Sequence, residues 1–97
     1  MAFEDFRSYL NNHKPSKVEF DLDYDTDYYG DYTYVDITIE YYYRAVYDDD
    51  GSDWREISYD ISRARSVIYD ALSYANSRYG ATVKINSIKE ENTYDPD

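Results

Sequence analysis

Carboxylates recur at alternate positions early in the chain, at Glu19, Asp21, Asp23 and Asp25. In an extended strand, alternate residues project from one face and stand roughly 6.5–7 Å apart. Phosphates along one nucleic-acid strand are separated by a similar distance. A strand here would therefore present a row of charges with phosphate-like spacing. Asp36 and Glu40, on the corresponding face of the next predicted strand, are expected to add a second, roughly parallel row.

The charge in this region is of one sign. From Val18 to Tyr43 there are eight acidic residues and no Lys or Arg, and the 97-residue chain has a net charge of −11. Like charges side by side weaken a sheet, and a surface serving only solubility would mix both signs. We interpret the rows as a contact surface, with a solvated face of biased composition as the alternative. The charge disfavours direct binding to nucleic acid or an anionic membrane and favours a basic partner or a metal ion.

A second acidic cluster surrounds Gly51 and contains Asp48, Asp49, Asp50 and Asp53. Calcium loops combine carboxylates with a glycine at a sharp turn, but the spacing here does not match the EF-hand pattern. We interpret the segment as an acidic hairpin tip that contacts a second basic patch on a partner. A calcium-binding module is an alternative function, although we predict no metal site and no cofactor.

Tyrosine is unusually abundant, with 15 residues, many of them between the acids. Carboxylates form charge-assisted bonds with guanidinium groups, and aromatic rings stack on them. Tyr34 and Tyr42 are therefore expected to stack on a partner's arginines or to take the place of bases. Self-association through the tyrosines, as in a structural or adaptor protein, is a further alternative.

Catalytic patterns are missing from the sequence. The single histidine, His13, lies in a polar break beside Lys14 and Pro15, and there is no cysteine. We find no nucleophile elbow, phosphate loop or zinc set, so we expect a binding protein and not an enzyme. Without a signal-peptide core or an apolar run of about 20 residues, the expected location is the cytoplasm, that of the host cell if the protein is phage-encoded.

Hydrophobic periodicity predicts one α+β domain over residues 1–97, in the order α-β-β-β-α-β. Phe3, Phe6 and Leu10 recur at helical spacing, and an apolar stripe from Ile61 to Tyr79 marks a long helix. The predicted elements are helix 3–12, a three-stranded antiparallel segment over 17–59 (strands 17–25, 32–47 and 54–59), helix 61–79, strand 81–88 and a flexible tail 89–97. The long helix should cover the apolar face of a mostly antiparallel four-stranded sheet.

In type, the chain resembles the small acidic phage-encoded inhibitors that imitate nucleic acid, such as anti-CRISPR proteins, anti-restriction proteins and uracil-DNA glycosylase inhibitors. The resemblance consists of the length, the absence of cysteine, a pI near 4.3, and the two rows from Glu19 to Asp25 and from Asp36 to Glu40. It implies steric and electrostatic blocking of the basic groove of a DNA-processing or host defence protein, first of all a CRISPR effector. The inhibitor would act as a monomer or homodimer. Because the class shares no fold, it implies nothing about architecture.

Overall fold

The computed structural model describes residues 2–27 and 29–95. Met1, Tyr28, Pro96 and Asp97 lie outside the described residues, and with them the ends of the predicted domain and of the predicted tail. The chain is an α+β fold with elements α1 (Ala2–His13), β1 (Val18–Thr26), β2 (Thr33–Tyr41), the 3₁₀ turn η1 (Ala45–Tyr47), α2 (Ser52–Tyr79) and β3 (Val83–Asn92). The predicted fold class is confirmed, and the first helix and first strand match to within one residue.

The sheet has three strands in the order β1-β2-β3. β1 is antiparallel to β2, and β3 is parallel to β2. The predicted four-stranded, mostly antiparallel sheet is therefore wrong. The connection from β2 to β3 runs through α2, which carries the chain back along the sheet. β3 therefore begins at the end of the sheet where β2 began, and the two strands are parallel.

The error arises at residues 54–59, which were predicted as a strand and lie in the first and second turns of α2. Trp54, Ile57 and Ile61 extend the apolar stripe of the helix at spacings of three and four. Ile57 and Ile61 are each only 6% exposed. The aromatic and β-branched residues of this segment favour strands as single residues, but burial of a continuous helical face decides the structure.

Two further boundaries differ from the prediction. β2 ends at Tyr41, so residues 42–47 leave the sheet although they were predicted as part of a strand ending at 47. β3 continues to Asn92 beside β2, so the segment from Lys89 to Asn92 is not a flexible tail. Glu90 in this segment forms an ion pair of 2.7 Å with Arg65 of α2.

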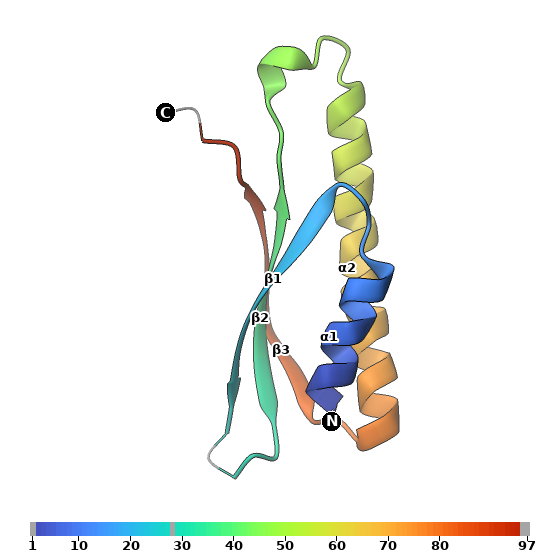
Figure 1. The fold of residues 1–97 in the computed structure, drawn as a ribbon, viewed down its shortest axis with the longest axis vertical. Coiled ribbons are helices and arrows are strands. Elements are labelled where there is room, and N and C mark those ends of the chain that lie inside the picture. The colour runs from blue at the N-terminus through green and yellow to red at the C-terminus, as the bar shows by residue number, and fades with distance from the viewer. Residues whose placement is uncertain (1, 28, 96–97) are drawn as a thin grey trace.

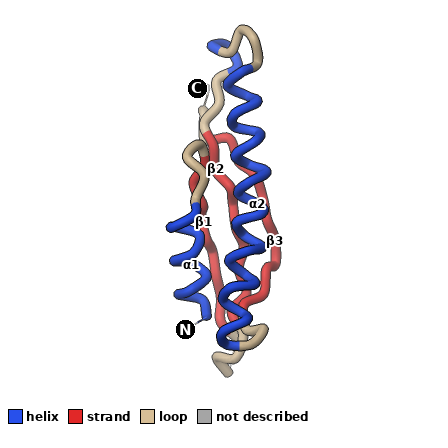
Figure 2. Tube along the Cα trace, turned by 90° about the vertical axis from the view of Figure 1, so that its right-hand side faces the viewer, coloured by secondary structure: helices blue, strands red, loops and turns tan. Residues whose placement is uncertain are grey.

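Both helices cover the same face of the sheet, and the other face is left open (Figures 1 and 2). α1 and α2 run antiparallel, since Asp5 near the start of α1 pairs with Arg78 near the end of α2 at 3.5 Å. The core lies between the helices and the sheet. Its largest fully buried side chains are Phe6, Leu10, Val18, Val35, Ile37, Ile39, Ile68 and Val83.

The molecule is elongated, with principal extents of 51 × 26 × 16 Å. α2 has 28 residues and is about 42 Å long, whereas strands of nine or ten residues span about 30–34 Å. The first turns of α2 and residues 42–51 therefore project beyond the sheet (Figure 1).

Candidate partner-binding surface

The open face of the sheet, here called the outer face, consists of the side chains of β1, β2 and β3 that point away from the helices. The register places Glu19 opposite Glu40 and Asp23 opposite Asp36. Asp21 and Asp25 complete the β1 row, opposite Thr38 and Tyr34. The structure thus brings the six carboxylates of the two expected rows together on one face.

β3 adds a third row that sequence reasoning did not include, because part of this strand was predicted as a tail. Lys84 lies opposite Tyr34, Ser87 opposite Asp36, Lys89 opposite Thr38 and Glu91 opposite Glu40. The outer face therefore carries seven carboxylates and two lysine ammonium groups, a net charge of −5 out of −11 for the chain. The acids concentrate on β1 and β2, and the two lysines flank them on β3.

The carboxylates of the β1 row are mostly unneutralised. Asp21, Asp23 and Asp25 are exposed, and among the residues that the structure describes their side chains have no hydrogen-bond or ion-pair partner. Glu19 pairs with Lys14 at 3.1 Å, and Asp36 accepts a hydrogen bond of 2.6 Å from the Ser87 hydroxyl. The β1 row therefore keeps its charge available for a partner.

The start of β1 is fixed by Asp60 of α2. Asp60 is 7% exposed. Its carboxylate accepts the Lys17 backbone N–H at 3.1 Å and the Ser16 hydroxyl at 3.5 Å. These bonds tie the segment before β1 to the helix and so set which β1 residues reach the outer face.

The two expected aromatic contacts lie near opposite ends of the outer face. Tyr34 is 37% exposed and lies opposite Asp25 within the sheet. Tyr42 follows the end of β2 and is 58% exposed, with its ring edge-on to that of Tyr94 at 5.8 Å between centroids.

The acids of the second cluster belong to the start of α2 and not to a hairpin tip. The Asp48 carboxylate accepts the backbone N–H groups of Asp53 (3.2 Å) and Trp54 (3.0 Å) and the hydroxyl of Tyr43 (3.0 Å). Asp50 accepts the backbone N–H of Ser52 at 3.0 Å. The first backbone N–H groups of a helix have no acceptor within the helix, and the carboxylates of Asp48 and Asp50 accept hydrogen bonds from three of them. Asp49 and Asp53 are exposed.

The pKa values of this cluster follow its hydrogen bonds. Partial burial raises the pKa of Asp48, but the bonds from Trp54, Asp53 and Tyr43 outweigh it, so the pKa lies below its ordinary value. Backbone and hydroxyl bonds from Ser52 lower the pKa of Asp50. The pKa of Tyr43 is raised by burial, by its bond to Asp48 and by the charges of Asp48 and Asp53.

Neither a metal site nor a membrane span is found in the part of the chain that the structure describes. Over residues 2–27 and 29–95, no three acidic or histidine side chains gather closely enough to hold a metal ion. No helix within these residues is long and apolar enough to cross a bilayer. The oxygens of Asp48 and Asp50 that a calcium ion would need already accept backbone N–H groups.

Comparison of the chain with protein-family models, with curated proteins and with solved structures gives no match.

Proposed function

We propose that this protein is an acidic inhibitor whose outer face occupies the basic nucleic-acid-binding groove of another protein, in the place of phosphates. The observation that carries the proposal is the register of β1 and β2, which aligns six carboxylates in two facing rows on the face that no helix covers (Figure 2). Same-face residues on a strand stand roughly 6.5–7 Å apart, a spacing that a groove lined with Lys and Arg for phosphates would meet.

The energetics of the face favour a binding role over a purely structural one. Facing carboxylates such as Asp23 and Asp36 destabilise the sheet, and the β1 row has almost no internal cation to offset this. A basic groove would supply the missing cations. Charge complementarity of this kind raises the association rate and selects partners.

The two tyrosines extend the same surface. Tyr34 within the face and Tyr42 at its end present rings to an incoming guanidinium, which aromatic faces attract. Tyr and Arg are over-represented among the residues that dominate binding energy at protein interfaces. By the resemblance described above, the first target class to test is a CRISPR effector, followed by other DNA-processing proteins.

The test is an inhibition assay on purified RNA-guided nucleases, with the inhibitor added before the guide RNA, before the DNA, or after both. The wild-type chain should block cleavage at low salt and lose potency as salt increases, because exposed charges are screened. The variant Asp21→Lys/Asp23→Lys/Asp25→Lys reverses the β1 row and should abolish inhibition.

A matched control makes the same total charge change away from the predicted contacts, with Glu4→Lys, Asp70→Lys, Ser62→Lys and Ser66→Lys at exposed helix positions, and should inhibit like the wild type. If the control and the β1 variant inhibit equally well, the outer face is not the contact surface. If the wild-type chain inhibits none of the nucleases, and the same holds for other DNA-processing enzymes, the phosphate-mimic function is refuted.

A further inference from the structure

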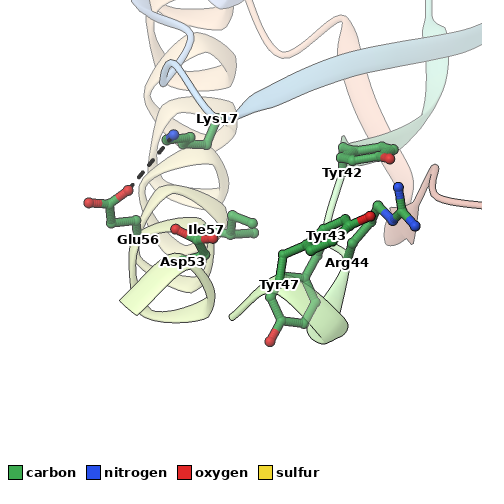
Figure 3. A pocket seen from close by; sticks show the side chains of 8 residues that line it. All are labelled: Lys17, Tyr42, Tyr43, Arg44, Tyr47, Asp53, Glu56 and Ile57. Atoms are coloured by element: carbon green, nitrogen blue, oxygen red, sulfur yellow. Dashed lines mark ion pairs between the residues drawn. The ribbon is translucent and has the colours of Figure 1, made fainter. Parts of the chain in front are cut away.

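A cavity of about 450 Å³ lies beyond the end of the sheet, between residues 42–47 and the first turns of α2. Its two walls differ in chemistry. Tyr42, Tyr43 and Tyr47 form one wall, and Asp53, Glu56 and Ile57 of α2 form the other. Figure 3 shows the rings of Tyr43 and Tyr47 across the open space from the α2 side chains.

Four charged side chains line the cavity, two of each sign: Lys17, Arg44, Asp53 and Glu56. Lys17 pairs with Glu56 at 3.8 Å. The Arg44 guanidinium extends away from α2 (Figure 3) and lies over the rings of Tyr47 and Tyr94, at 4.5 and 4.8 Å from their centroids.

The Asp53 carboxylate, by contrast, has no hydrogen-bond or ion-pair partner among the residues that the structure describes. It is close enough to Tyr43 for its charge to raise the pKa of that hydroxyl. The cavity therefore combines an aromatic wall with a carboxylate that no described cation pairs with, while the four charged side chains that line it sum to zero.

Within the aromatic wall, the Tyr43 backbone is held by the end of β3. The amide of Asn92, the last residue of β3, accepts the Tyr43 backbone N–H and donates to the Tyr43 carbonyl, each at 3.0 Å. Thr93 donates its backbone N–H to the carbonyl of Tyr41, the last residue of β2, at 2.7 Å. The Tyr43 backbone therefore loses little conformational entropy when a ligand binds.

We propose that this cavity binds a guanidinium group, such as the side chain of an arginine on a partner protein. A planar guanidinium can stack on tyrosine and donate hydrogen bonds to a carboxylate at the same time. The wall already shows the first of these contacts, since Tyr47 stacks with Arg44 of the same chain. The site adjoins the end of the outer face, with which it shares Tyr42, but the inference does not depend on the proposed function.

The experiment titrates N-acetyl-arginine-amide into the purified chain and follows the fluorescence of Trp54, the single tryptophan, whose ring lies 5.0 Å from that of Tyr43. Amide chemical shifts of Tyr47 and Asp53 provide a second readout. We expect saturable binding that Asp53→Asn weakens roughly tenfold, as for loss of one charge-assisted contact. The matched control Asp49→Asn removes one exposed charge from the same cluster and should bind like the wild type. N-acetyl-lysine-amide should bind more weakly than the arginine probe.

Three outcomes would overturn the inference: no saturable response, equal weakening by the two Asn variants, or equal binding of the lysine and arginine probes. The thermal unfolding of each variant shows whether it is folded. The tyrosine wall is tested separately by Tyr47→Leu, which leaves Asp53 in place and should also weaken binding. The titration contains no partner protein. A negative result would therefore leave the proposed function standing, and a positive result would not support it.

Discussion

Replacing Asp23 with Asn should make the protein more stable, because Asp23 faces Asp36 across the β1–β2 pair. Directly opposite side chains have Cβ atoms about 5 Å apart, and two unit charges at about 5 Å in water repel by about 0.8 kcal/mol. In the unfolded chain Asp21 and Asp25 remain beside Asp23, whereas Asp36 moves away. The cross-strand repulsion is therefore the part that changes on folding.

The size of the effect depends on salt. With a Debye length of about 8 Å at 0.15 M, the repulsion falls to about 0.4 kcal/mol, and at about 1 M it falls to about 0.2 kcal/mol. At about 0.01 M it stays near 0.7 kcal/mol. For a domain of this size, about 0.4 kcal/mol corresponds to an increase in Tm of about 2–3 °C.

The assay is thermal unfolding followed by circular dichroism at these three salt concentrations. Asp70→Asn, on the exposed side of α2, removes the same charge from a position with no facing acid and serves as the control. In an Asp36→Asn background, Asp23→Asn should give no further gain, which isolates the pair. The reasoning is refuted if Asp23→Asn and Asp70→Asn raise Tm equally at every salt concentration, or if the gain does not shrink as salt increases.

Three further predictions concern the support of this surface. The pKa values of Asp48 and Asp50 are lowered in the fold. The stability that these carboxylates give the folded protein is therefore present above their pKa in the unfolded chain, and it is lost as the pH falls through their pKa in the folded protein. Urea unfolding at pH 6 and pH 3 should therefore show a stability loss that is smaller in Asp48→Asn, and an equal loss would contradict this. Asp60→Ala leaves the part-buried Lys17 N–H without its acceptor and should lower the free energy of unfolding by about 1–3 kcal/mol, whereas Asp60→Asn keeps an acceptor oxygen and should lose less; equal losses would contradict the role of that bond. Ile68→Ala opens a cavity in the core and should cost about 2–5 kcal/mol in urea unfolding, and a cost below about 1 kcal/mol would mean that the site collapses around the gap.

Local patterns in the sequence were sufficient for the elements that are amphipathic over their full length. The alternation of Val18, Phe20 and Leu22 with acids defines β1 and places the carboxylates of this strand. The spacing of Ile61, Ala64 and Ile68 defines most of α2. In both cases the period of the apolar residues matches the element that buries them.

The start of α2 was not predictable from the residue directly before the helix, because that residue is Gly51 and has no side chain to cap it. The N–H groups of Ser52, Asp53 and Trp54 are satisfied by Asp50 and Asp48, two to six residues away. Reading 54–59 as a strand turned a strand–helix–strand connection into a hairpin. That error gave β3 the wrong direction relative to β2. Lys89 was left out of the predicted surface for another reason, since the last predicted strand ended at residue 88.

The central position of β2 has a consequence for the chain as it is synthesised. β2 pairs with β3 only after residues 42–82 have been made, so until then the β2 edge that β3 will cover is unpaired. The β2 segment is rich in β-branched residues, which favours pairing between incomplete chains when an edge is open. Asp36 and Glu40 interrupt this run with like charges, a device that limits aggregation of exposed strands. We therefore expect the same carboxylates that form the outer face to help keep incomplete chains apart on the ribosome.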